Sequence, residues 1–417
     1  GEKLGIATRF QMGRLSLVTG QFDTAAEAFS AVQEAVEETG GAQMPAAVRD
    51  QLMKRPDAIY TLFGESYLKA HQFEKAETAF RRANEHKLAP AQLAFQLARI
   101  ETEQGNQPDA LDLLQQYFDS KTKTAGLAPY VLLTRLIDGS QTRQADPPAP
   151  AGAAPTAPPR SAAGKPSDAL VAKLQKLAKA DPNNALLGYY LADTLRRAER
   201  WKPAERLYKR WLKQEPTLDG HLGLINIYRR QARWTPLLKQ LAGITTETGS
   251  LVPVATETDK IVSDPVSLDQ ITEEGEAYVA AADSTRPEGT WLTLALLSAA
   301  GDRGEAALAY LERGLEKPIA KAGEAASEVA FSLLQADRPR QAAGVFQRVL
   351  DDKLLPDRTA EIYYYLAGAW AAADRFNKSL SAANHAARRA PNSPRMVARE
   401  AWVLFQADRL KEARAKY

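Results

Sequence analysis

Residues 60–90 read YTLFGESYLKAHQFEKAETAFRRANEHKLAP. Small side chains at Gly64 and Ala76 let two antiparallel helices approach closely, and large side chains such as Phe73 and Phe80 fill the space around that contact at helical spacing. The stretch therefore predicts a helical hairpin.

The hairpin pattern recurs after 34 residues, which indicates an internal repeat. The matched residues are Tyr60 and Ala94, Gly64 and Ala98, His71 and Gly105, Ala76 and Ala110, and Phe80 and Leu114. An earlier copy carries Gly13, Gly20, Phe22, Ala25 and Phe29, and an inserted stretch follows it around residues 38–56. We expect about three hairpins in residues 1–143.

The pattern resumes in the second part of the chain. A half-unit covers roughly residues 168–183, the next unit runs between Pro182 and Pro216, which are 34 residues apart, and a weaker unit covers residues 219–249. Four tandem units occupy the C-terminal part, and the last of them is cut short. We expect an irregular acidic insertion near residues 245–287.

In its period and in the order of its small and large residues, the chain resembles the tetratricopeptide repeat (TPR) proteins. The resemblance covers about four-fifths of the chain. It weakens at the inserted stretch near residues 38–56, in the unit after Asp219 and in the acidic insertion. The resemblance implies an all-α fold, a right-handed superhelical α-solenoid of tandem helical hairpins whose first helices line a concave face.

Residues 144–166, QADPPAPAGAAPTAPPRSAAGKP, contain seven prolines and eight alanines. Proline fixes φ and removes a backbone donor, so this composition predicts a semi-extended linker. The solenoid then has two segments, at residues 1–143 and 168–417, joined by the linker at residues 144–167. The alternative is that the half-unit docks on the first segment and the linker is a long surface loop.

Bulk composition excludes several kinds of site. The chain has no cysteine, which excludes disulfides, thiol nucleophiles and thiolate metal sites. Its 54 basic and 51 acidic residues give a net charge of +3, which provides no global attraction to nucleic acid or an anionic membrane. No apolar run reaches the roughly 20 residues of a membrane-spanning helix, so we expect no span in this sequence.

The ends and the composition bear on the origin of the chain. The first residues lack the long apolar core of a signal peptide, and both ends interrupt helical patterns, so we interpret the chain as a fragment. Its wealth of alanine, arginine, glutamine and proline is typical of bacteria. The location stays open between the bacterial cytoplasm and the periplasm or envelope.

No concentrated set of catalytic residues is found. Motifs for a zinc protease, a serine nucleophile and a phosphate-binding loop are missing. The four histidines are scattered over different units, at His71, His86, His221 and His385. Gly301–Gly304 is interpreted as a hairpin turn, and Glu273 with Glu274 as part of a solvated helix start. We predict no enzyme activity and no catalytic, cofactor-binding or metal-binding residue.

Helical phase predicts which side chains of the first helices face a partner, on the side opposite the hairpin contact. These are Thr61, Glu65, Phe95 and Arg99 in the first segment, Tyr189, Asp193 and Arg196 after the linker, and Phe331, Tyr364, Trp402 and Phe405 in the C-terminal units. The last set suits an apolar or extended peptide, because aromatic anchors give large contact areas. Core packing is the alternative for each of its members, because three consecutive tyrosines at 363–365 cannot all face one way.

Some TPR proteins grip a C-terminal carboxylate with lysine and asparagine at set inward places. The corresponding places here carry Thr61, Glu65, Tyr189 and Asp193. We therefore do not expect this chain to hold a C-terminal carboxylate in that way.

Charge is segregated into two adjacent blocks. Residues 160–239 contain 17 basic and 7 acidic residues, whereas residues 247–288 contain 2 basic and 10 acidic residues. The basic block carries Trp201, Tyr208 and Trp211, which resembles a nucleic-acid surface with stacking aromatics, although these three residues also occupy packing places of the repeat. A further hypothesis is that the acidic block folds back on the basic block as an internal ligand.

We therefore predict a non-enzymatic scaffold or adaptor that binds peptides or partner proteins in the concave groove, within a larger bacterial assembly. Affinity would come from repeated small contacts over several units. Self-association through the ends of the solenoid is an additional expectation. Two alternatives stay open: a nucleic-acid-binding solenoid that uses the basic block at residues 160–240, and a helper region of a larger enzyme whose catalytic domain lies outside this sequence.

Overall fold

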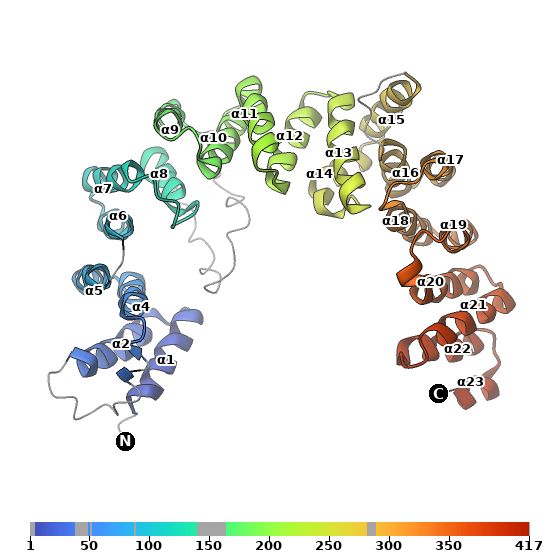
Figure 1. Cartoon of the computed structure of the whole chain (residues 1–417), viewed down its shortest axis with the longest axis horizontal. Helices are drawn as coiled ribbons and strands as arrows, with labels where there is room; N and C mark the ends of the chain where they lie inside the picture. The colour runs from blue at the N-terminus through green and yellow to red at the C-terminus, as the bar shows by residue number, and fades with distance from the viewer. Residues whose placement is uncertain are drawn as a thin grey trace. The chain divides into compact units, whose positions relative to one another are not determined.

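The computed structural model describes residues 5–37, 49–50, 52–86, 89–139, 164–281 and 289–416, and every regular element within them is a helix (Figure 1). The described residues form helical hairpins, as the repeat pattern predicts, and the all-α solenoid is confirmed. By their contacts the residues fall into two compact units, Gly1–Trp211 (unit 1) and Leu212–Tyr417 (unit 2). Within the described ranges, no helix has the length and apolar character that crossing a bilayer requires.

The helices of unit 1 are α1 (Ile6–Val18), α2 (Phe22–Glu37), α4 (Pro56–Lys69), α5 (Phe73–Glu85), α6 (Pro90–Gln104), α7 (Gln107–Asp119), α8 (Ala128–Asp138), α9 (Asp168–Ala180), α10 (Ala185–Arg197) and α11 (Trp201–Gln214). The last of these, α11, crosses the boundary between the units. Three antiparallel pairs, α1 with α2, α4 with α5, and α6 with α7, are the predicted N-terminal hairpins.

The helices of unit 2 are α12 (Leu218–Arg230), α13 (Trp234–Thr248), η1 (Val252–Val254), α14 (Ala255–Val262), α15 (Pro265–Ala280), α16 (Thr290–Ala300), α17 (Gly304–Glu316), α18 (Ala322–Gln335), α19 (Pro339–Asp351), η2 (Pro356–Arg358), α20 (Thr359–Ala372), α21 (Phe376–Arg389), α22 (Pro394–Gln406) and α23 (Leu410–Lys416). The four pairs from α16 to α23 are the tandem C-terminal hairpins.

Two of the three N-terminal hairpins, α1 with α2 and α4 with α5, close on a contact between a glycine and a phenylalanine ring. A Cβ added to Gly64 on α4 would lie 2.5 Å from the ring of Phe80 on α5, and one added to Gly13 on α1 would lie 2.7 Å from the ring of Phe29 on α2. Both rings are fully buried. Only glycine admits the ring at this distance, so the predicted packing of small against large residues is confirmed at these positions.

The 34-residue period is visible in side-chain hydrogen bonds between equivalent positions of neighbouring hairpins. Arg99 on α6 donates to the carboxylate of Glu65 on α4, 34 residues earlier, with Nη2 2.8 Å from Oε2. The Tyr310 hydroxyl donates in the same way to the carboxylate of Glu276. The second pair shows that the repeat spacing continues through the C-terminal part of the acidic insertion.

The irregular acidic insertion near residues 245–287 stays a prediction, and its described part is mostly helical. Residues 255–262 and 265–280 form α14 and α15, which pack on the neighbouring helices of unit 2. The physical reason is that this stretch alternates its acidic residues with apolar ones at helical spacing, and Ile261, Leu268 and Ile271 are buried. Residues 282–288 lie outside the described residues.

The helices on either side of the predicted linker pack on one another within unit 1. The carboxylate of Asp138 at the end of α8 accepts hydrogen bonds from the backbone N–H and hydroxyl of Ser167, which caps α9. The hydroxyls of Thr134 on α8 and Tyr190 on α10 are 2.6 Å apart. This arrangement is that of the docked half-unit, whereas residues 140–163 lie outside the described residues. The division into independent segments at residues 144–167 stays a prediction.

Cutting the chain between residues 144 and 163 tests that division. With an inserted protease site there, we expect the two pieces to co-elute in size-exclusion chromatography, because α8, α9 and α10 share buried contacts. The uncut protein is the control for the elution volume. Separation of the pieces at micromolar concentration would instead support two segments that move independently.

Candidate functional site

The site residues predicted in the first segment lie together, and they bond mainly to one another. The guanidinium of Arg99 on α6 binds the carboxylate of Glu65 on α4 in a two-pronged ion pair, with Nη2 2.8 Å from Oε2. Phe95 is buried, with its ring 5.9 Å from the Arg99 guanidinium, and the Thr61 hydroxyl donates to the carbonyl of Asp57 at 2.7 Å.

The ion pair changes the pKa of both partners. Burial alone would raise the pKa of Glu65, but the charge and hydrogen bonds of Arg99 outweigh burial and hold that pKa below its usual range. Burial likewise opposes the charge on Arg99, and the Glu65 carboxylate raises the pKa of Arg99 despite it. Glu65 and Arg99 therefore neutralise one another and join α4 to α6.

The residues predicted on α10 also lie together. The carboxylate of Asp193 pairs with Nη2 of Arg196 at 2.6 Å and with Nε of Arg197 at 3.2 Å. The ring of Tyr189 lies 6.4 Å from the ring of Tyr208 on α11. Asp193 thus pairs with two arginines one turn away on its own helix. The role of these residues in partner binding stays a prediction.

The predicted C-terminal residues lie on α18, α20 and α22, the first helices of three consecutive hairpins. All four are aromatic, whereas the two groups described above contain ion pairs. Phe331 on α18 packs edge-on against Tyr365 on α20 at 4.7 Å, and Tyr365 lies 5.5 Å from Tyr364. Phe331 is half-buried by this packing, whereas Phe405 on α22 is 57% exposed.

Two arginines that the sequence reasoning missed complete this surface. The guanidinium of Arg399 on α22 lies 3.8 Å from the ring centre of Tyr364 and 4.6 Å from that of Trp402. Arg395, one turn earlier, lies 4.4 Å from the ring centre of Tyr364. We call the surface made by Phe331, Tyr364, Tyr365, Arg395, Arg399 and Trp402 the arginine–aromatic face.

A signal for the missed arginines does exist in the sequence. Arg395, Arg399 and Trp402 are spaced i, i+4 and i+7, which places all three on one side of a helix. Helical phase identifies Trp402 but not Arg395 or Arg399, because it selects positions of the repeat and takes no account of the charges beside them. That Arg399 would lie against Tyr364 depends on the contact between α20 and α22, which the sequence does not show.

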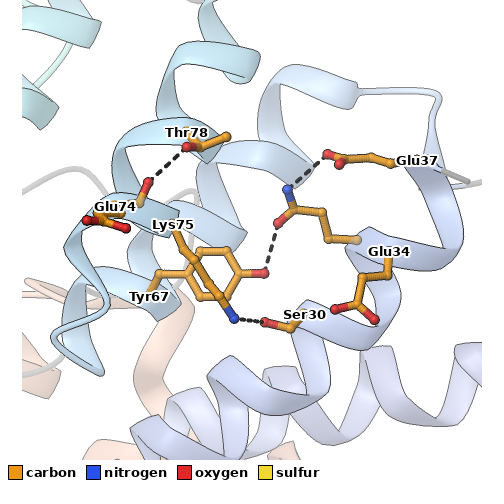
Figure 2. Close-up of a pocket in the computed structure, with 8 residues that line it drawn as sticks. Ser30, Glu34, Glu37, Tyr67, Glu74, Lys75 and Thr78 are labelled. Carbon is orange, nitrogen blue, oxygen red and sulfur yellow. Dashed lines mark hydrogen bonds between the residues drawn. The ribbon is translucent and has the colours of Figure 1, made fainter.

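A small cleft in unit 1 is the second candidate (Figure 2). It measures about 300 Å³, and its walls come from α2, α4 and α5. The Lys75 amine donates to the Ser30 hydroxyl at 3.1 Å, and the Tyr67 hydroxyl donates to Gln33, which donates to Glu37 at 2.9 Å. Burial, together with the nearby carboxylates, raises the pKa of Tyr67 to about 12. The polar groups of this cleft bond to one another, so we interpret it as packing between hairpins.

The described residues give no support to a metal site and little to a nucleic-acid surface. No three histidine, aspartate or glutamate side chains come together there as a metal ion would require. In the basic block, the rings of Tyr208 and Trp211 are buried, with 3% and 5% of their surfaces exposed. Two of the three aromatic residues of the nucleic-acid alternative are thus packing residues, which leaves little ring surface for bases to stack on.

A family model agrees with the helical hairpins in two stretches of the chain. A family model described as tetratricopeptide repeat matches residues 61–122 and 330–394. The search of curated proteins found no match for this sequence. The chain is similar to the crystal structure of the APC/C hetero-tetramer Cut9-Hcn1, with 10% identity over 96% of this chain and 97% of that one, at a TM-score of 0.26. It is also similar to the P58(IPK) TPR domain, with 11% identity over 97% and 98% of the two chains, at a TM-score of 0.24.

The matched stretches contain α5, α6 and α7 in unit 1, and α19 to α21 in unit 2, which are hairpin helices with the spacing described above. Tetratricopeptide repeats are typically a non-catalytic fold that binds other proteins. The chain therefore contains tetratricopeptide repeats in both units, at residues 61–122 and 330–394, with hairpins of the same kind around them.

Proposed function

We propose that this chain is a non-enzymatic adaptor that holds an extended peptide or a partner protein on the arginine–aromatic face of unit 2. The observation that carries the proposal is the position of Arg399 between the rings of Tyr364 and Trp402, next to Arg395. Tryptophan, tyrosine and arginine are the residues that contribute most often to binding hot spots. Membership of a bacterial assembly, and self-association through the ends, are further parts of this proposal.

The other predicted positions support this choice of surface. Glu65 with Arg99, and Asp193 with Arg196, balance their charges within the chain. On α20 and α22, by contrast, two arginines stand beside aromatic rings, and the exposed side chain of Phe405 follows. A partner therefore gains more from contact with this face than with the internally paired positions.

Selection from a random-peptide display library on the full chain tests the proposal. We expect the selected peptides to lose at least tenfold in affinity for Trp402→Ala, since truncation of a hot-spot residue costs about 2 kcal/mol or more. Trp291→Ala is the matched control, because Trp291 is a half-buried tryptophan of the same unit that also lies beside an arginine, at 5.2 Å from Arg313. Equal affinities for the two variants would contradict the proposed surface.

A further inference from the structure

Arg399 is a partly buried arginine that forms no ion pair with a carboxylate of the described residues. Its guanidinium lies between the rings of Tyr364 and Trp402, and its Nε is buried without a hydrogen-bond partner in the described residues. Gly368 on α20 makes room for it, since a Cβ there would lie 3.1 Å from Nη2 of Arg399. An unpaired buried donor is costly, so this group is expected to gain by contact with an acceptor.

The carboxylates nearest to Arg399 in the chain are bound by other groups. Glu361 on α20 accepts from Nε of Arg358 at 2.8 Å and from the Tyr365 hydroxyl at 3.1 Å. Glu400, the neighbour of Arg399 on α22, pairs with Nζ of Lys416 at 2.7 Å. Glu400, which is closest in sequence, and Glu361, which lies on the facing helix, thus bind groups other than Arg399.

Charge around Arg399 favours an anionic partner. Residues 385–416 contain eight lysines and arginines against three acidic residues. Burial lowers the pKa of Arg399, and the positive charge of Arg395 lowers it further against the opposing effect of Tyr364. A carboxylate placed beside the two guanidinium groups would outweigh the repulsion between them, because it attracts each group at a distance of about 4 Å.

We infer that Arg395 and Arg399 bind side-chain carboxylates of an acidic, extended segment of a partner protein, with Tyr364 and Trp402 as the walls that hold the guanidinium of Arg399. This inference rests on the proposed function and names the chemistry of its partner. Two arginines one turn apart in a basic surrounding suit several carboxylates rather than the single carboxylate of a chain end. Guanidinium groups already cover the facing sides of Tyr364 and Trp402, so stacked nucleic-acid bases fit less well.

The experiment uses the full chain and the peptides selected from the random library. Each peptide is resynthesised with every Asp and Glu replaced by Asn and Gln, and a second copy carries an amidated C-terminus. We expect the neutral copy to bind wild-type protein at least about tenfold more weakly, because a guanidinium group forms stronger hydrogen bonds with a charged carboxylate than with a neutral amide. The amidated copy should bind as well as the parent peptide. Higher salt should weaken binding of the parent peptide.

Variants of the protein assign the preference to a residue. Arg399→Gln should remove the difference between acidic and neutral peptides, and Arg399→Lys should keep part of it, because lysine retains the charge without the planar pair of donors. Arg313→Gln is the matched control, since Arg313 lies over a tryptophan of the same unit but is exposed. Thermal melting of each variant checks folding, and Arg399→Lys keeps the test valid if Arg399→Gln unfolds.

The outcomes separate this inference from the proposed function. Peptides that depend on Trp402 but bind equally well in acidic and neutral form would overturn the inference and leave the proposed function standing. Peptides that do not depend on Trp402 would overturn both. Dependence on the free C-terminus, or tighter binding of a single-stranded oligonucleotide than of any acidic peptide, would also overturn the inference.

Discussion

Phe80→Ala should lower the free energy of unfolding of the α4–α5 hairpin by about 3–5 kcal/mol. The ring is fully buried, and it lies so close to the α4 backbone that a Cβ on Gly64 would come within 2.5 Å of it. Truncation removes this contact and leaves a cavity between the helices, which the backbone around Gly64 fills only in part. Hydrogen exchange of the α4 and α5 amides measures the loss, because repeat arrays open locally.

The matched control is Phe405→Ala in unit 2. Its side chain is 57% exposed, so the same chemical change should alter stability by no more than about 0.5 kcal/mol. A similar loss in the two variants would show that burial against Gly64 is not what stabilises the first hairpins.

Glu257→Ala should destabilise unit 2 by about 3 kcal/mol at neutral pH. The Glu257 carboxylate is buried and accepts from Nδ2 of Asn226 at 3.2 Å, from Nε of Arg229 at 2.8 Å and from Nζ of Lys260 at 2.6 Å. Its removal leaves Arg229, which is 20% exposed, without its acidic partner on α14. Denaturant unfolding measures the loss. Asp259→Asn, an exposed change on the same helix, is the control and should have little effect.

The cost of Glu257→Ala should also depend on pH. Burial opposes ionisation of Glu257, but its bonds to Lys260, Arg229 and Asn226 outweigh burial and lower its pKa. A carboxylate with a lowered pKa in the folded state stabilises the fold above its unfolded pKa of about 4.3, and this contribution is lost as the pH falls through the folded pKa. The difference between wild type and variant should therefore shrink on acidification from pH 7. A difference that stays constant down to the acid transition would rule out an ionised, paired Glu257.

The acidic block has a structural role that qualifies the internal-ligand hypothesis. In unit 2 its acids contact the C-terminal end of the basic block, since Glu257 pairs with Arg229, and Glu274 accepts from the N–H and hydroxyl of Thr235 at 3.1 and 3.0 Å. Deleting residues 247–286 would therefore also remove buried side chains of α14 and α15. Point substitutions such as Glu274→Gln test the hypothesis without that loss of core.

Much of the fold could be predicted because its determinants are local. The contact of Gly64 with Phe80 joins two residues 16 positions apart, and the same order recurs after 34 residues. A pattern of small and large residues therefore specifies each hairpin before any distant contact is known. The repeat pattern is weaker over α14 and α15, which predicted an irregular acidic insertion there, although one side of each helix is apolar and buried.

The candidate site could be predicted only in part. Helical phase identified Tyr364 and Trp402, but it also identified Glu65 and Arg99, which the structure shows to be paired with each other. Whether a charged side chain is paired depends on which side chains of the neighbouring hairpin lie opposite it. It also depends on the direction in which long side chains extend across the contact between the hairpins.

The sequence by itself determined that this protein is a series of helical hairpins, because small and large side chains at fixed spacing allow one close packing of two helices. Only the tertiary structure decided which charges stay available to a partner. Arg99 on α6 pairs with Glu65 on α4, the first helix of the preceding hairpin. Arg399 on α22 instead lies against Gly368 and the ring of Tyr364 on α20, the first helix of its preceding hairpin. Arginine thus forms an ion pair at position 99 and forms none at position 399 within the described residues. The reason is that an ion pair requires a carboxylate within a few ångströms in space, whatever the spacing along the chain.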